Sequence, residues 1–160
     1  INENSISPKA KCGANYINSR MAHIEAVENG YDTGILLNSH GYVSEAPGAC
    51  LFLIKDQCLV TPSMTNSILN SITRDSVINI CLKELGLRVI ERNIDRSELY
   101  LADEAFLCGT AMEIKPVLSF NKVDLGDGSV GPLCKSLMEI YDNICRKKNS
   151  LFSEWLSPVR

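Results

Sequence analysis

Apolar residues recur every three or four positions in three separate segments of the chain. This spacing places them on one face of a helix, so it predicts amphipathic helices packed on one side. The predicted helices are residues 15–29, 72–85 and 132–146. Asn29 and Gly30 supply a stop signal for the first helix, while Thr73 is placed to cap the second and Gly86 to end it. In the first helix, the residues expected to face the core are Ile17, Met21, Ile24 and Val27.

Short apolar runs separated by polar turns lie between the predicted helices. Such runs are typical of strands, and neighbouring runs are typical of hairpins. The predicted strands are residues 33–38, 42–46, 50–55, 58–61, 87–94, 104–109 and 113–120. We also expect a short helical segment at 96–101 and a turn-rich segment at 121–131. Because helices alternate with hairpins, the order of elements favours a mixed α/β (α+β) domain over a helix bundle.

The composition is that of one ordinary globular domain of 160 residues. The net charge of -3 argues against the basic stripe that a nucleic-acid-binding protein needs. The longest apolar run, residues 50–54, is far too short to cross a membrane. No secretory signal is visible, so we expect a cytoplasmic protein whose partners are neither nucleic acid nor membrane.

The chain contains seven cysteines, and their spacing decides how they are interpreted. No pair forms a C-x-x-C motif, and no histidine stands at metal-ligand spacing from them. An odd number of cysteines without an export signal favours reduced thiols, mostly buried as small hydrophobic side chains. We therefore expect no metal site. The cysteines are Cys12, Cys50, Cys58, Cys81, Cys108, Cys134 and Cys145.

Two lysines stand two residues apart in the segment SPKAKCGANY, residues 7–16. In an extended backbone, the side chains of Lys9 and Lys11 would leave the same face of the strand. A lysine becomes a nucleophile only where its charge is discouraged by desolvation or by another cation. Small residues follow Lys11 and let another group approach, whereas Lys9 follows a proline. Lys11 is the better candidate, beside the commoner role of any lysine as a surface charge.

Three further polar features suit a ligand that carries an anionic group. The turn at residues 70–75 leads into the second predicted helix, whose free NH groups and dipole form an anion site. The small-residue corner at 108–111 can present backbone NH groups in the same way, and Glu45 offers a carboxylate. Each feature also has a plain explanation as a capped helix or a loop. With a lysine, they are the amine, acid and phosphate donors that a pyridoxal phosphate enzyme needs.

Five motifs, in the same order, resemble the second half of the branched-chain amino acid aminotransferases, in the class IV (fold-type IV) group of pyridoxal phosphate enzymes. The resemblance runs from about Lys11 to Val159. The motifs are KCGANY, YVSE with GACLF, ILNSITRD, LYLADEAFLCGTAMEIKPV and GDGSVGP. It implies that residues 1–160 form the larger, C-terminal cofactor-binding domain, with a hairpin-rich, barrel-like sheet flanked by helices. It also implies an N-terminal small domain, which this chain does not contain.

The resemblance gives each candidate residue a role. Lys11 matches the catalytic lysine that binds pyridoxal 5'-phosphate covalently, Tyr16 the tyrosine at the phenolic oxygen of the cofactor, and Glu45 the glutamate at its ring nitrogen. Thr110 matches a phosphate contact and, with Ala111, lies where the substrate carboxylate is bound. The other implied cofactor contacts, which include the backbone NH groups at the helix start, are Leu69, Ser71, Ile72, Thr73 and Gly109.

The implied reaction is the transamination of leucine, isoleucine and valine with 2-oxoglutarate, which gives branched 2-oxo acids and glutamate. Lys11, once released by the incoming amino acid, would move a proton from the α-carbon of the substrate. D-Amino acid aminotransferase and aminodeoxychorismate lyase share the lysine, glutamate and phosphate corner, so both stay open as alternatives. An inactive domain that only binds cofactor or dimerises is a third. The resemblance also implies a homodimer or a higher homo-oligomer.

Three positions depart from the pattern of the family. Cys50 stands at an asparagine position, Ser71 replaces a glycine beside the phosphate, and Ala14 replaces the second glycine of the lysine motif. None of these changes removes a catalytic group, but Cys50 bears on substrate preference. Because the chain begins at Ile1 and members of the family are longer, we expect it to be a piece of a larger protein.

Overall fold

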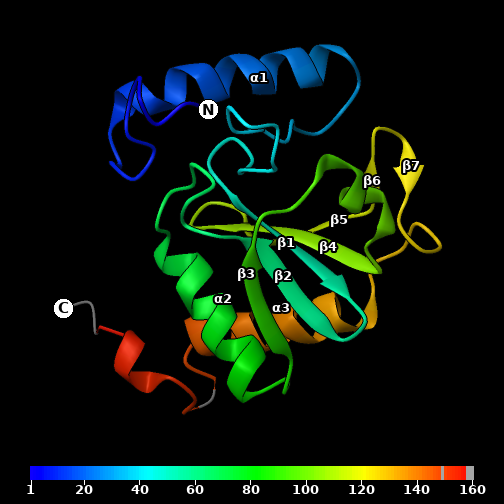
Figure 1. Ribbon diagram of the computed structural model, residues 1–160. Helices are drawn as coiled ribbons and strands as arrows, with labels where there is room; N and C mark the ends of the chain where they lie inside the picture. Colours follow the sequence, from blue (N-terminus) through cyan, green and yellow to red (C-terminus); the bar gives the residue numbers. More distant parts are fainter. Residues whose placement is uncertain (149, 158–160) are drawn as a thin grey trace.

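The computed structural model describes residues 1–148 and 150–157, so Val159, at the end of the region of resemblance, lies outside the described residues. A five-stranded sheet forms the centre of the molecule, in the strand order β3-β2-β1-β4-β5 (Figure 1). β1 is antiparallel to β2 and β4, β4 is antiparallel to β5, and β2 is parallel to β3. The strands are β1 (Cys50–Lys55), β2 (Cys58–Pro62), β3 (Arg88–Arg92), β4 (Glu104–Gly109) and β5 (Glu113–Val117).

Alternating side chains give the sheet two buried faces. On β1, Phe52 points toward the helices, whereas Leu51 and Leu53 point to the opposite face. Phe52 stacks on Phe106 of β4 with ring centroids 5.1 Å apart. Two helices cover the first face (Figure 1), and these are α2 (Ile72–Lys83) and α3 (Pro132–Cys145). Because β1 is apolar on both sides, both faces of the sheet must be covered.

Irregular chain and short elements cover the opposite face. Val43 and Ile94 are fully buried there, and Leu99 and Leu125 nearly so. The short elements are the 3-10 helix η2 (Arg96–Leu101) and the two-stranded sheet of β6 (Ser119–Phe120) and β7 (Val123–Asp124). A last 3-10 helix, η3 (Ser153–Trp155), follows α3. The result is the mixed α/β architecture that the sequence predicts.

Helix α1 (Tyr16–Glu28), which follows the 3-10 helix η1 (Gly13–Asn15), stands apart from the sheet (Figure 1). Its inner face consists of small side chains: Ser19 is buried, and Ala22 and Ala26 lie against Gly34. The prediction that its apolar residues face the core was wrong, because periodicity identifies a face and not what that face contacts. The exposed residues, each 48% to 66% exposed and called here the apolar stripe of α1, are Ile17, Met21, Ile24 and Val27.

The hairpin predicted at residues 33–46 is only partly regular. The backbone NH of Leu36 donates to the carbonyl of Glu45 at 2.8 Å, but its pairing is limited to isolated bridges, such as Leu37 with Val43. Val43 also donates to the carbonyl of Ile94 at 2.9 Å. Because this segment divides its hydrogen bonds between two neighbours, neither predicted strand is continuous.

Two other expectations also need correction. The strand predicted at 113–120 is broken at Leu118 into β5 and β6, and β7 occupies part of the segment predicted as turns. Among the described residues the sheet is open, with β3 and β5 at its edges, so the expected barrel-like closure does not occur in this part of the chain.

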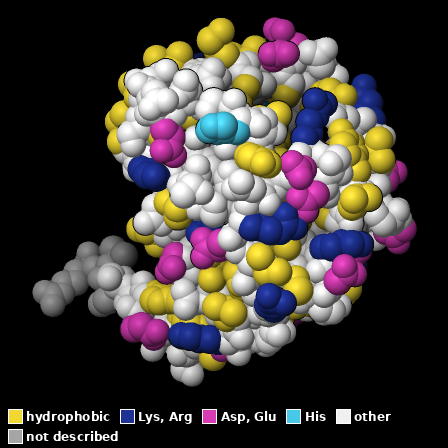
Figure 2. Space-filling view, in the orientation of Figure 1, with side chains coloured by type: hydrophobic (Ala, Val, Ile, Leu, Met, Phe, Trp, Pro, Cys, Tyr) yellow, Lys and Arg dark blue, Asp and Glu magenta, His cyan; other side chains and the backbone are white. Residues whose placement is uncertain are grey.

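No helix of residues 1–148 or 150–157 is long and apolar enough to span a membrane. Acidic and basic side chains are interspersed on the face that Figure 2 shows.

Candidate active site

A cavity of about 460 Å³ opens between the N-terminal segment, the start of α2 and the end of β4. It brings together residues that lie almost 100 positions apart in the chain, and most of the predicted site residues line it. Those that line it are Lys11, Tyr16, Glu45, Leu69, Ser71, Gly109 and Thr110. Ile72, Thr73 and Ala111 are neighbours of lining residues in the sequence but do not line the cavity themselves.

Lys11 lines the cavity from a turn that precedes η1, whereas Lys9 does not line it. The backbone is folded here, because the NH of Cys12 donates to the carbonyl of Ala10 at 2.9 Å. The extended backbone that would put both lysines on one strand face is therefore not present. Lys9 Nζ instead lies 3.8 Å from a carboxylate oxygen of Glu3. Lys11, whose side chain is exposed, is the lysine available to a ligand in the cavity.

Asn15 holds the turn that carries Lys11. Its Nδ2 donates to the carbonyl of Ser7 at 2.7 Å and to the carbonyl of Ala10 at 2.6 Å, so it ties both ends of the turn to the start of α1. Asn15 also lines the cavity. Sequence reasoning missed this role, because its acceptors are backbone carbonyls that any residue would offer.

Glu45 presents a half-buried carboxyl group to the cavity. Its Oε2 accepts a hydrogen bond from the backbone NH of Leu69 at 3.0 Å. Next to it, Ser44 Oγ donates to the carbonyl of Ser67 at 2.9 Å, so two bonds join these segments. Burial raises the pKa of Glu45, and the hydrogen bond from Leu69 opposes this shift only in part. A cation beside this carboxyl would favour its charged form.

Ser71, and not Thr73, caps α2. Ser71 Oγ accepts a hydrogen bond from the backbone NH of Arg74 at 3.3 Å, and its carbonyl accepts from the NH of Asp75 at 3.1 Å. The predicted cap was wrong because Thr73 already lies inside the first turn. The NH groups of Ile72 and Thr73 precede the first helical hydrogen bond, so they have no acceptor within the helix. They can donate to an anion at the helix start.

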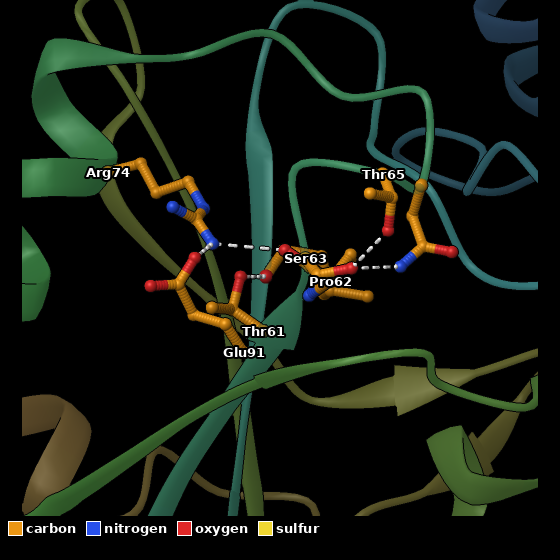
Figure 3. A network of polar contacts seen from close by, with 8 residues as sticks. Thr61, Pro62, Ser63, Thr65, Arg74 and Glu91 are labelled. Atoms are coloured by element: carbon orange, nitrogen blue, oxygen red, sulfur yellow. Dashed lines mark hydrogen bonds and ion pairs between the residues drawn. The ribbon is translucent and has the colours of Figure 1, made fainter.

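Arg74 anchors the start of α2 to the sheet (Figure 3). The residue is only 4% exposed, and its Nη2 donates to the carbonyl of Pro62 at 3.0 Å and to Glu91 Oε2 at 2.7 Å. Pro62 ends β2 and Glu91 lies in β3, so a single guanidinium joins three elements. Asn66 Nδ2 also donates to Ser63 Oγ at 2.9 Å. The first turn of α2 is therefore fixed relative to the sheet, a second role that the sequence did not reveal.

The corner after β4 approaches the loop before β1 so closely that it needs a glycine. A Cβ atom on Gly109 would lie 2.9 Å from the carbonyl oxygen of Gly48, closer than side chains approach a backbone oxygen. Cys50 of β1 and Cys108 of β4 line the cavity beside this corner, and Thr110 follows it. No group of histidine, cysteine or acidic residues that could hold a metal ion occurs among residues 1–148 and 150–157.

The cavity brings together a lysine in a turn of small residues, a half-buried carboxyl group and the start of a helix. These are the parts that the class IV motifs imply. Residues 1–120 match the family model described as amino-transferase class IV. The chain belongs to this family.

The chain is similar in sequence, over almost its whole length, to particular members of the family. It is 47% identical over 157 residues to the probable branched-chain-amino-acid aminotransferase of Aquifex aeolicus, a match that covers 98% of this chain and 50% of the relative. It is 42% identical over 156 residues to the branched-chain-amino-acid aminotransferase of Salmonella typhimurium, with coverage of 98% and 50%. The chain thus spans about half the length of the curated relatives it matches.

Solved structures give the same result at the level of the fold. The crystal structure of the branched-chain amino acid aminotransferase from Thermobaculum terrenum in its PLP-form matches with a TM-score of 0.97 and 46% identity, over 100% of this chain and 52% of that one. The branched-chain aminotransferase from the thermophilic archaeon Thermoproteus uzoniensis, solved with norvaline, matches with a TM-score of 0.94 and 38% identity, over 100% and 52%.

Proposed function

We propose that residues 1–160 are the C-terminal cofactor-binding domain of a pyridoxal 5'-phosphate-dependent branched-chain amino acid aminotransferase. The enzyme transfers the amino group of leucine, isoleucine or valine to 2-oxoglutarate, and the products are branched 2-oxo acids and glutamate. The observation that carries this proposal is the meeting of Lys11, Glu45 and the start of α2 at one cavity. The names of the relatives, which are about twice as long as this chain, support the branched-chain substrates.

The residues around the cavity fit pyridoxal 5'-phosphate. Glu45 is a half-buried carboxyl group that forms no ion pair among the described residues, so it suits a ligand that brings its own positive ring nitrogen. The NH groups of Ile72 and Thr73, which have no acceptor within α2, suit a phosphate group, and Ser71 lies beside them. Lys11 supplies the amine, and the cavity between these groups is large enough for a small cofactor.

The predicted site residues have defined tasks in the proposed reaction. When bound, the cofactor supplies a ring that accepts electrons. Lys11 would hold it and would move the proton that leaves the α-carbon of the amino acid, and Tyr16 would donate a hydrogen bond to its phenolic oxygen. Leu69 and Gly109 would be further contacts of the cofactor. Thr110 and Ala111 bind the carboxylate of the substrate.

Three further parts of the proposal concern the whole protein. A homodimer or a higher homo-oligomer is supported by the apolar stripe of α1, since contiguous exposed apolar residues mark contact surfaces. A cytoplasmic location and the lack of nucleic-acid or membrane partners stay expectations. D-Amino acid aminotransferase and aminodeoxychorismate lyase remain the rival activities, and the names of the relatives favour the branched-chain reaction.

The test uses the full-length protein that contains this chain, its Lys11→Ala variant and, as a matched control, Lys9→Ala. We expect the absorbance band of the lysine-bound cofactor in the wild type and in Lys9→Ala, and its loss in Lys11→Ala. Transamination is then measured with leucine, D-alanine and aminodeoxychorismate. Leucine should be turned over, and Lys11→Ala should reduce its rate by at least about a hundredfold.

Two results would contradict the proposal. If Lys9→Ala removed the band and Lys11→Ala kept it, the lysine would be misassigned. If the full-length protein turned over only D-alanine or aminodeoxychorismate, the branched-chain activity would be wrong although the cofactor site was right.

A further inference from the structure

Cys50 and Cys108 lie directly opposite each other on neighbouring strands. They are paired in the register of β1 and β4, and their side chains share the face that α2 and α3 cover. The next pair on that face is Phe52 with Phe106, whose rings stack at 5.1 Å. This contact demonstrates that paired side chains on this face touch across the two strands. Cys50 is 4% exposed and Cys108 is fully buried.

The spacing of two opposite residues suits a disulfide. Opposite residues of antiparallel strands have Cα atoms about 4.5 to 5.5 Å apart, and disulfides join Cα atoms at about 4.4 to 6.8 Å. A bond between Cys50 and Cys108 therefore needs no large movement of either strand.

The surroundings single out Cys50 as the more reactive of the buried thiols. The thiol of Cys108 lowers the pKa of Cys50, and burial and Glu45 oppose this shift without cancelling it. Arg74 also lowers it. Burial has the opposite effect on Cys81, whose pKa it raises to about 12. The nucleophile in thiol oxidation is a thiolate, which a lowered pKa favours at Cys50.

Access is provided by the cavity of the active site. Both Cys50 and Cys108 line it, although neither is exposed on the outer surface. A molecule as small as hydrogen peroxide can reach them there, whereas other buried thiols, Cys81 and Cys134, do not line the cavity.

We propose that Cys50 and Cys108 form a reversible oxidation site, which a peroxide closes into a disulfide. Cys50 loses its proton, and the thiolate attacks one oxygen of the peroxide so that the O–O bond breaks. Cys50 becomes a sulfenic acid, and the other oxygen leaves as hydroxide, which takes up the proton that Cys50 lost and becomes water. Cys108 then attacks the sulfur of Cys50, the S–O bond breaks, and a second water leaves with the proton of Cys108. Two thiols are oxidised and one peroxide is reduced to two waters. A dithiol reductant reverses the change.

This site rests in part on the proposed function, because a cofactor in the cavity would block the peroxide. We expect pyridoxal 5'-phosphate to slow the formation of the disulfide. If oxidation requires an empty cavity, a ligand concentration of about ten times its Kd should slow it about tenfold.

The experiment treats the full-length protein with hydrogen peroxide, blocks the remaining thiols with N-ethylmaleimide, and maps disulfides by mass spectrometry after digestion. We expect a peptide pair linked through Cys50 and Cys108, and its loss after dithiothreitol. The variant Cys108→Ala should abolish the linked pair, and Cys145→Ser, which removes an exposed thiol, should keep it. The mapping in the wild type decides the proposal even if Cys108→Ala does not fold.

The outcomes separate the two proposals. Linkage of Cys81 or Cys134 to either residue, or oxidation confined to Cys12 and Cys145, would overturn the oxidation site. Linkage of Cys50 to Cys108 at the same rate with and without pyridoxal 5'-phosphate would keep the thiol pair and contradict the cofactor site.

Discussion

At Gly109 the backbone of β4 closely approaches the loop before β1, and residues of both segments line the cavity. We expect Gly109→Ala to lower the free energy of unfolding by about 1 to 3 kcal/mol, because its Cβ would lie 2.9 Å from a backbone oxygen of Gly48. Urea denaturation of the full-length protein measures the change. Gly13→Ala is the control, since its Cβ would meet nothing within 4 Å. Equal destabilisation by both variants would contradict the close approach.

At the scale of residues, the sequence pointed to residues that line the cavity better than to the residues that hold the site in place. Lys11, Glu45 and Thr110 belong to motifs, and each lies at the cavity. Asn15 and Arg74 were missed, because their partners are largely backbone carbonyls, which carry no residue-specific signal. A cap at Ser71 was detectable in principle, since serine before an apolar helix is favoured there.

The pairing of Cys50 with Cys108 also could not be predicted from the sequence. A shift of one residue in strand register turns a side chain to the other face, and the register of strands far apart in the chain is set by packing. The stack of Phe52 on Phe106 is one such packing contact.

Arg74 joins α2 to the sheet, and we expect two variants of this anchor to lower the free energy of unfolding by different amounts. Glu91→Leu leaves the buried guanidinium of Arg74 without its carboxylate, and we expect it to lower the free energy of unfolding by about 2 kcal/mol, since Glu91 is partly screened by water. Arg74→Met removes the buried charge and fills similar space, at an expected cost of about 1 kcal/mol.

Chemical denaturation of the two full-length variants compares these costs. Arg92→Met is the surface control, because the pair of Arg92 with Glu98 is exposed enough to contribute less than about 1 kcal/mol. A larger loss in Arg74→Met than in Glu91→Leu would mean that the bond to Pro62, and not charge pairing, holds the helix.

The helices and central strands were predictable as elements, because long periodic segments and short apolar runs carry strong signals. What each of these elements packs against could not be predicted in the same way. For α1, the sequence identified the apolar stripe, but only the structure revealed that Ala22 and Ala26 face the body of the protein. The loop at 33–46 was mispredicted for a related reason, because its backbone bonds depend on the distant residue Ile94.

For the whole molecule, the apolar stripe of α1 leads to a test of assembly. We expect Ile24→Lys in the full-length protein to weaken a homodimer at least about tenfold, because a charge would be buried in the contact. Light scattering after size exclusion measures the mass. Glu25→Lys also adds positive charge to an exposed position of α1 but leaves the stripe intact. An unchanged mass in Ile24→Lys would exclude the stripe from the interface.

The position of β1 in the sheet has a consequence for how the protein is made on the ribosome. β1 and β2 emerge before β4, so the strand that ends in the centre of the sheet is at first its open edge. Leu51, Phe52 and Leu53 then offer unpaired backbone groups and apolar side chains to any other strand. Substitutions that delay the pairing of β4 would therefore show first as insolubility of the newly made chain, before any loss of stability in the folded enzyme.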